Sequence, residues 1–285
     1  MHASAVNCLK LINIGRTAQT RSTIAAYLAS LAGIRSRSLL DRRLAAIGYQ
    51  HKLHGLEWNA GHPAIRSTLR GIGRTHGRHR QRRQAVALTS IEIKQLLKVC
   101  PADLGGARDR ALLLLAFSGA LRRSELVGLD HDDIRQTATG LRLTIRSSKT
   151  DAEAMGVELG IPRGKQPETC PVRALADWLA RAAIDRGPIF RKVDRWGHVE
   201  RDRLGADGVR RILRRRAQQA GLTVDPSERL SPHGLRAGFV TEAYMAGARD
   251  EQIMAHSRHK DLKTMRGYVR RARLVSDSPV KLLDI

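Results

Sequence analysis

Apolar residues recur at helical spacing along most of the chain. In the first third, residues 18–34, 39–49 and 65–72 each place aliphatic and aromatic side chains, including Tyr49, at intervals of three or four positions. Gly33 lies near the end of the first pattern, where a glycine commonly ends a helix. The spacing therefore predicts an all-helical amino-terminal domain over residues 1–85.

A second series of patterns occupies residues 86–285. The first predicted helix is capped by Thr89 or Ser90, and its apolar face consists of Ile91, Ile93, Leu96 and Leu97. Further helices are predicted over residues 108–117, 121–126, 171–183, 208–220, 232–246 and 250–257. Apolar and polar residues alternate instead over 141–145 and 157–161, with an acidic turn at 151–153 between them. This alternation predicts a β-hairpin on the edge of a small sheet. The expected fold class is therefore α+β, mainly α with a small β-sheet.

The chain is strongly basic. Its 51 lysines and arginines against 27 acidic residues give a formal net charge of +24. An ordinary hydrophobic fraction of 42% excludes a disordered basic tail. The excess is concentrated towards the amino terminus, where Asp41 and Glu57 are the only acidic residues before Glu92. Nucleic acid is the polyanion that such a surface most often binds.

Linker, cysteine and hydropathy patterns narrow the class of protein further. Residues 74–83 form a basic run without apolar periodicity, which is typical of a linker that can follow a phosphate backbone. Cys8, Cys100 and Cys170 are widely separated and lack metal-ligand spacing, so we expect reduced thiols. No stretch approaches the ~20 apolar residues of a membrane span. A cytoplasmic protein without membrane contact is expected.

Candidate chemistry lies near the carboxyl end. Ser231 and Pro232 resemble the cap and first turn of a helix, so His233 and Arg236 are expected on one face of its opening turns. A helix start also presents backbone N–H groups, which favour a bound phosphate. Alone, such a pair is most often a coincidence of the surface.

Two further positions carry charge beside predicted breaks in structure. Arg122 begins a predicted helix, and Glu125 three residues later can hold a neighbouring basic group. An exposed ion pair at this spacing is ordinary by itself. Lys149 lies at the tip of the predicted hairpin, where an ammonium group near other cations can donate a proton.

A histidine and a tyrosine complete the set. His259 precedes Tyr268 by nine positions, and arginines at positions 266, 270 and 271 flank the tyrosine. A tyrosine hydroxyl ordinarily ionises near pH ~10. Nearby guanidinium groups favour the anion, which can attack phosphorus. The conjunction of these residues, rather than any one of them, indicates a site that surrounds a phosphate.

In order and spacing, these motifs resemble those of the tyrosine recombinase, or phage integrase, family. The matching segments are Gly-Ala-Leu-Arg-Arg-Ser-Glu-Leu at 119–126, Ser-Lys-Thr at 148–150, His-Gly-Leu-Arg at 233–236, His-Lys-Asp-Leu-Lys-Thr at 259–264 and Tyr268. The resemblance covers about residues 88–275, and a weaker similarity to the family's helical core-binding domain covers roughly residues 20–85.

The resemblance implies a site-specific DNA recombinase. A SAM-like core-binding domain would occupy residues 1–85, and an integrase-type catalytic domain with a carboxy-terminal tail would occupy residues 86–285. The implied catalytic residues are Arg122, Glu125, Lys149, His233, Arg236, His259 and Tyr268.

Each of these residues takes a role from the resemblance. The two arginines would clamp the nonbridging oxygens of the scissile phosphate. Tyr268 would attack phosphorus to form a 3′-phosphotyrosyl link, and Lys149 would protonate the departing 5′ oxygen. The two histidines would hydrogen-bond the phosphate or manage the tyrosine proton, and the glutamate would orient the cluster.

The resemblance also implies partners. Double-stranded DNA would be bound by four copies of the chain on two paired sites, with residues 272–285 forming a tail that each protomer contributes to a neighbour. No metal or other cofactor is implied, because arginines take the place of metal ions. The setting would be integration, excision or resolution of a phage, transposon or plasmid.

The pattern offers one alternative histidine and departs from the family in one region. His256 precedes Ser257, a pair common at the family's third histidine motif, but the nine-residue spacing favours His259. Residues 1–15 look irregular where family members of this type carry a longer helical region. The first helix of the DNA clamp is therefore expected to be missing or altered, which affects encirclement of DNA.

Other interpretations stay open on the residues alone. A type IB topoisomerase shares the chemistry but relaxes DNA as a monomer, and a noncatalytic DNA-binding relic would keep the fold without the reaction. His51, His54 and His62 could be drawn as a metal set, but no cysteine or carboxylate completes the ligands.

Overall fold

The computed structural model describes residues 21–76, 83–146 and 156–272, with positions 278, 280 and 283 singly. The chain divides into two compact units, Met1–Arg82 and Arg83–Ile285. Within the described ranges, helices predominate and the strands are short, which confirms the predicted α+β class. No helix in these ranges has both the length and the apolar character needed to cross a membrane.

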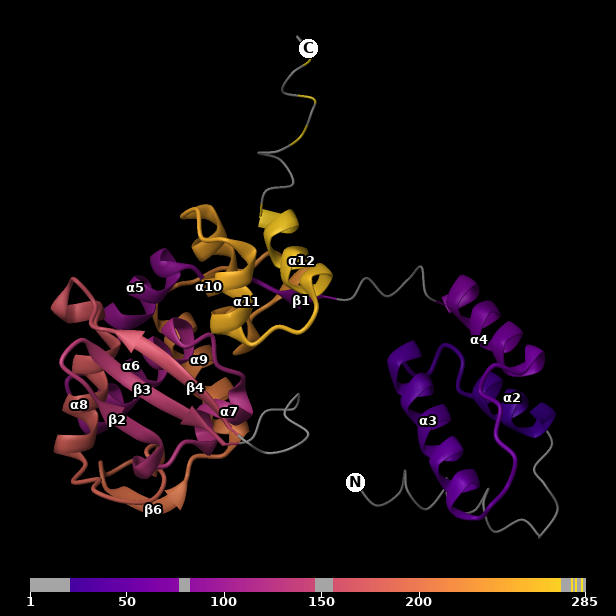
Figure 1. The fold of residues 1–285 in the computed structure, drawn as a ribbon, viewed down its shortest axis with the longest axis horizontal. Helices are drawn as coiled ribbons and strands as arrows, with labels where there is room; N and C mark the ends of the chain where they lie inside the picture. The colour runs from indigo at the N-terminus through magenta and orange to yellow at the C-terminus, as the bar shows by residue number, and fades with distance from the viewer. Residues whose placement is uncertain are drawn as a thin grey trace. The chain divides into compact units, whose positions relative to one another are not determined.

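In the described part of the first unit, residues 21–76, three helices bring their apolar faces together. They are α2 (Arg21–Ser30), α3 (Arg37–Leu53) and α4 (Pro63–His76) (Figure 1). Their shared core is built from Ile24, Leu28, Leu40, Leu44, Ile47, Ile65, Leu69 and Ile72. The expected apolar role of Tyr49 is wrong, because this side chain is 61% exposed. The adjacent Ile47 and Gly48 are buried, so Tyr49 lies on the side of α3 that faces away from this core.

The second unit surrounds one buried helix. Its helices are α5 (Ser90–Lys98), α6 (Leu104–Ser118), α7 (Arg123–Gly128), α8 (Pro171–Arg181), α9 (Ala206–Gln219), α10 (His233–Met245), α11 (Asp250–Ser257) and α12 (Leu262–Ala272). Helix α6 is buried along almost its whole length, because neighbouring helices including α8, α10, α5 and α9 pack around it. Such an apolar surround is the reason its leucine-rich sequence lacks a polar face.

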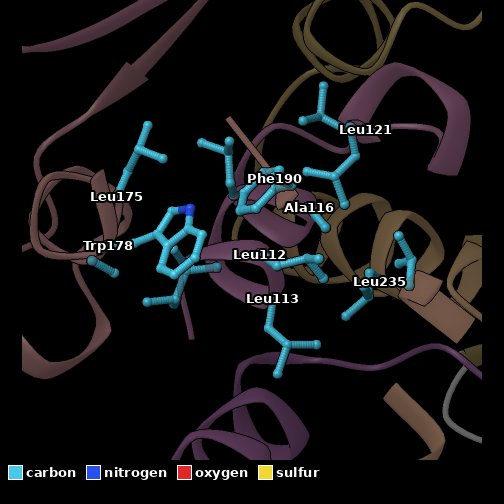
Figure 2. Close-up of a cluster of buried hydrophobic side chains, with 14 of the residues drawn as sticks. Leu112, Leu113, Ala116, Leu121, Leu175, Trp178, Phe190 and Leu235 are labelled. Atoms are coloured by element: carbon cyan, nitrogen blue, oxygen red, sulfur yellow. The ribbon is translucent and has the colours of Figure 1, made fainter. Parts of the chain in front are cut away.

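The core of this unit joins α6 to α8 and α10. Figure 2 shows Leu112 and Ala116 of α6 beside Trp178 of α8 and Phe190, with Leu235 of α10 in the same cluster. The indole nitrogen of Trp178 donates to the carbonyl of Ile189 at 2.7 Å, which satisfies its one polar group inside the core.

A small antiparallel sheet flanks the helices. Strands β3 (Gly140–Ile145) and β4 (Val157–Pro162) pair in the register that places Leu143 opposite Leu159, which confirms the predicted hairpin. Strand β2 (Ile134–Gln136) adds to the other side of β3. The expected acidic turn at 151–153 and Lys149 lie outside the described residues.

Several elements were not expected from the periodicity. Strands β5 (Arg191–Val193) and β6 (Val199–Arg203) form a polar ribbon, and helix α12 carries the candidate tyrosine. Ile91 is 64% exposed, so its predicted place on the apolar face of α5 is wrong. The other three residues of that predicted face are buried, namely Ile93, Leu96 and Leu97.

A parallel pair of two-residue strands fixes the start of α10. Strand β1 (Gln84–Ala85) pairs with β7 (Glu228–Arg229), and the chain continues so that the amide of Leu88 donates to the carbonyl of Gly234 at 3.0 Å. Gly238 lies one turn further along α10, where a Cβ would come within 1.7 Å of the Leu88 carbonyl oxygen. Glycine is therefore required for this close approach of backbone to helix.

Replacing Gly238 by alanine is expected to lower the free energy of unfolding by about 3 kcal/mol, because the buried backbone at Leu88 must move. Gly267 in α12 is the matched control: nothing lies within 4 Å of its Cβ position. Gly267→Ala should stabilise by about 0.5–1 kcal/mol through helix propensity. Urea unfolding of both variants measures the difference, and equal effects would contradict the packing argument.

Candidate active site

The candidate residues come from three places in the second unit. Arg122 is the N-cap of α7 and Glu125 lies in that helix's first turn, while His233 and Arg236 lie in the first turn of α10. His259 lies between α11 and α12, and Tyr268 lies in α12. Helices α10, α11 and α12 pack together (Figure 1). This packing brings His233, Arg236, His259 and Tyr268 to one side of the unit.

The start of α10 differs in detail from expectation. Pro232 occupies the N-cap position, and the hydroxyl of Ser231 is buried with no hydrogen-bond partner in the described part of the chain. Ser231 therefore does not cap the helix as predicted. The β1 and β7 pairing just before it holds this end of α10 instead.

The carboxyl end of α6 forms the floor of the site. The carbonyl of Ser118 accepts from His256 at 2.7 Å. The next two carbonyls, at positions 119 and 120, accept from Arg258 at 3.3 and 3.2 Å, and the second also accepts from Arg236 at 2.7 Å. The last carbonyls of a helix lack intrahelical partners and carry partial negative charge, so they suit cationic donors.

A network of ion pairs connects this floor to α7. The Glu125 carboxylate, which is buried, accepts from Arg122 at 2.5 Å and from Arg258 at 3.0 Å. Burial alone raises the pKa of Glu125, but the hydrogen bonds from Arg122 and the charges of Arg258 and Arg122 outweigh it and lower the pKa. Glu125 is therefore ionised at neutral pH. We call Arg122, Glu125, Arg236 and Arg258 the arginine cluster.

The arginine cluster retains positive charge. One carboxylate cannot neutralise three guanidinium groups, and the carbonyl partners carry no net charge. Arg236 is 1% exposed, and its Nη2 has no hydrogen-bond partner among the described residues. Burial, followed by the charges of Arg122 and Arg258, lowers its pKa to about 10, so it still carries its proton at neutral pH. A buried cation with an unpaired donor favours binding of an anion.

Tyr268 faces two histidines at the edge of this cluster. Its hydroxyl lies 2.7 Å from Nε2 of His233, and its ring centroid lies 5.8 Å from that of His259. His233 is an exposed residue, yet desolvation of its ring lowers its pKa, followed by the charges of Arg236, Arg229 and Arg122. A neutral His233 can accept the tyrosine proton at Nε2 in the tautomer that keeps its own proton on Nδ1.

The tautomer of His259 follows from its neighbours. The hydroxyl of Ser257 donates its one proton to the carbonyl of Ile253, so it accepts from Nδ1 of His259, at 2.6 Å. Burial, then the charges of Arg236 and the rest of the surrounding cations, lowers the pKa of His259 to about 4. At neutral pH the ring is therefore uncharged, with Nε2 free of a proton.

The structure separates the two candidate histidines of this region. His256 donates to the Ser118 carbonyl and stacks on Phe239, with ring centroids 4.7 Å apart. His259 lies against Tyr268. The nine-residue spacing thus selects the histidine beside the tyrosine, and His256 supports the floor.

The lowered pKa of His259 predicts a pH-dependent stability. Its folded pKa of about 4 lies below the ordinary value near 6.5, so its contribution is present above pH ~6.5 and is lost as pH falls towards 4. Between pH 7 and 4.5, wild type should lose about 1–2 kcal/mol relative to His259→Gln, after allowance for partial exposure. Urea unfolding at both pH values tests this, and parallel curves would contradict it.

The structure adds one residue that the pattern missed and corrects another. Arg258 lies inside the arginine cluster, and the only local signal was a non-glycine residue after a helix end, where glycine is usual. Arg266 was expected to favour ionisation of Tyr268, but its guanidinium pairs with Asp250 through Nε at 2.8 Å. Lys149 lies outside the described residues.

Comparison with known proteins agrees with this architecture. The model of the phage integrase family matches residues 87–273. An integrase/recombinase XerD homologue of Selenomonas ruminantium is 32% identical over 260 residues, which cover 90% of this chain and 75% of the relative. The tyrosine recombinase XerC of Syntrophus aciditrophicus is 29% identical over 59% of this chain, which spans 50% of that relative's length.

Solved structures share the fold. Lambda integrase (residues 75–356) bound to DNA superposes with a TM-score of 0.60 at 17% identity, covering 94% of this chain and 88% of that one. The Tn1549 transposon integrase in complex with circular intermediate DNA gives a TM-score of 0.58 at 14% identity, covering 98% and 94%.

The fold and the sequence similarity together define a DNA strand-breaking and rejoining enzyme. The chain belongs to the phage integrase family of tyrosine recombinases, which confirms the family and the activity that the motifs indicate.

Proposed function

We propose that Tyr268 is the nucleophile of site-specific recombination and that the arginine cluster binds the scissile phosphate. The observation that carries this proposal is the pairing of a buried, partly unpartnered Arg236 with a tyrosine hydroxyl already hydrogen-bonded to His233. Arg236 supplies an anion site, and the hydrogen-bonded tyrosine supplies an activated nucleophile at the edge of the arginine cluster.

The cluster would stabilise the pentavalent transition state. Arg122 and Arg236 would each donate to nonbridging oxygens, where negative charge increases as the tyrosine oxygen attacks. Glu125 holds Arg122 by an ion pair at 2.5 Å, so the donor is oriented before DNA arrives. Preorganised donors cost little reorganisation during the reaction.

The proton balance uses two groups. Tyr268 would transfer its hydroxyl proton to Nε2 of His233 as its oxygen bonds to phosphorus, and the bond from phosphorus to the 5′ oxygen would break. Lys149 would give a proton to that departing oxygen. His259 would hydrogen-bond the phosphate once the anion raises the proton affinity of its ring. The 3′-phosphotyrosyl link conserves the energy of the phosphodiester, so another 5′ hydroxyl can reverse the step.

The proposal extends to the complex that the protein forms with DNA. Double-stranded DNA is the substrate, and four copies of the chain on two paired sites would exchange strands in turn. The helical first unit, with exposed basic residues on α3 and α4, would bind DNA beside the site of cutting. Integration, excision or resolution of a phage, transposon or plasmid in the cytoplasm is the proposed setting.

The test is recovery of covalently bound DNA. Tagged protein is expressed in cells that carry the DNA flanking its gene, isolated under denaturing conditions, and the retained DNA is sequenced. We expect DNA fragments with a common 3′ end joined to the protein. Absence of retained DNA would favour a noncatalytic DNA-binding protein.

The recovered sequence then separates recombination from topoisomerase activity. It is cloned on plasmids singly and as a pair, beside a plasmid without it. Rearrangement that requires the pair supports the proposal, whereas relaxation of every supercoiled plasmid without rearrangement would favour a type IB topoisomerase.

A further inference from the structure

Arg258 has an unusual backbone for its residue type. It follows α11 as the C-cap with φ 58° and ψ 41°, in the left-handed region that glycine adopts more readily than any other residue. A residue with a side chain is strained at such a position relative to glycine. Contacts of the Arg258 side chain must therefore offset this backbone strain.

The side chain of Arg258 contacts residues in and beside the arginine cluster. The guanidinium group is nearly buried and donates to Glu125 Oε2 at 3.0 Å and to the His256 carbonyl at 2.7 Å. It also donates to the carbonyls of Gly119 at 3.3 Å and Ala120 at 3.2 Å. Its own backbone carbonyl accepts from Arg122 Nη2 at 3.3 Å.

Two of these partners also contact Arg122 and Arg236. Glu125 orients Arg122, and the Ala120 carbonyl is shared between Arg258 and Nη1 of Arg236. Ala120 itself has φ 45°, so the turn at residues 119–120 is strained and needs external contacts to persist. Arg258 supplies such contacts to two successive carbonyls of this turn.

We infer that Arg258 is a positioning residue that sets, through Glu125 and the turn at residues 119–120, the two arginines proposed to bind the phosphate. This role rests on the proposed function and adds a residue to it. Both Nη atoms of Arg258 donate to protein groups, and its buried Nε has no partner among the described residues. Arg258 therefore acts on the reaction through its neighbours and through the charge it adds.

The left-handed backbone permits an unusually clean test. Arg258→Gly removes the side chain at a backbone conformation that glycine adopts without strain, so a defect in this variant does not come from added backbone strain. We expect strand cleavage on the recovered DNA site, measured in a single turnover, to slow on the order of 30-fold. Binding of the same DNA should change by less than about 3-fold, because the phosphate contacts outside the site are untouched. Arg258→Lys should fall between wild type and Arg258→Gly, because it restores charge without the forked geometry.

Three readouts separate positioning from a merely structural role. Added guanidinium ion should restore part of the cleavage rate to Arg258→Gly and none to wild type. The double variant with Glu125→Gln should be slowed by less than the product of the two single effects, because both changes break the contact between Arg258 and Glu125. The carboxyl pKa of Glu125, followed by NMR in glutamate-labelled protein without DNA, should rise in Arg258→Gly as its partner is lost.

The outcomes are distinguishable from those of the proposed function. Wild-type cleavage in Arg258→Gly, or an unchanged Glu125 titration, overturns the role of Arg258 while leaving Tyr268 as nucleophile. If the pKa of Glu125 rises in Arg258→Gly but the wild-type protein forms no covalent link with DNA, the proposed function is overturned, and with it any role of Arg258 in the reaction.

Discussion

Tyr268→Phe is expected to abolish the covalent link between protein and DNA. The change removes one oxygen and keeps the ring that packs beside the cluster of Val240, Ile253, Met265 and Val269. The fold should therefore persist, whereas the atom proposed to attack phosphorus is gone and His233 loses its hydrogen-bond partner. Loss of a covalent nucleophile lowers rates by more than about 10³-fold.

A denaturing gel with labelled DNA that contains the recovered site measures this loss. Tyr244→Phe is the matched control, because Tyr244 packs against the same apolar cluster and the change is chemically identical. It should retain covalent complexes at close to the wild-type amount. Equal loss in both variants would indicate damage to the cluster, and covalent complexes in Tyr268→Phe would identify another nucleophile.

The parts of the site that the sequence predicted are those with local signals. His233 and Arg236 share a turn of one helix, and the break at residues 118–119 marks the end of the buried α6. Their spacing is fixed by helix geometry, so a motif of four residues is enough to place them together. The alternation in residues 141–145 and 157–161 similarly determined the hairpin.

The missed parts depend on contacts between distant residues. Arg258 meets Glu125 and the turn at 119–120 across more than a hundred positions, and nothing near it in sequence indicates that partner. Exposure of Tyr49 and Ile91 depends on which helices cover α3 and α5, which periodicity alone does not specify. Ser231 resembled a cap, but the pairing of β1 with β7 determined where α10 begins.

Arg236→Met is expected to slow cleavage on the order of 10³-fold while making the protein slightly more stable. The loss of rate follows from removing a preorganised donor to the proposed transition state. The gain in stability follows from the electrostatics: Arg236 is buried beside Arg122 and Arg258, and its Nη2 lacks a partner among the described residues. The Ala120 carbonyl, which would lose Arg236, keeps its hydrogen bond from Arg258 at 3.2 Å. A methionine of similar length fills the space without the cost of an uncompensated charge, so the free energy of unfolding should rise by about 1 kcal/mol.

Arg216→Met is the matched control, because Arg216 is also a buried arginine of the second unit but is fully paired. Its Nε and Nη2 donate to the buried Asp109 carboxylate at 2.9 and 2.6 Å. Removing this partner leaves a buried carboxylate less compensated, so the free energy of unfolding should fall by about 3 kcal/mol. Urea unfolding of both variants compares the two arginines directly. Opposite signs would mean that Arg216 stabilises the fold, whereas Arg236 is retained at a cost in stability for the anion it binds. A destabilisation of Arg236→Met as large as that of Arg216→Met would show instead that Arg236 is a structural residue.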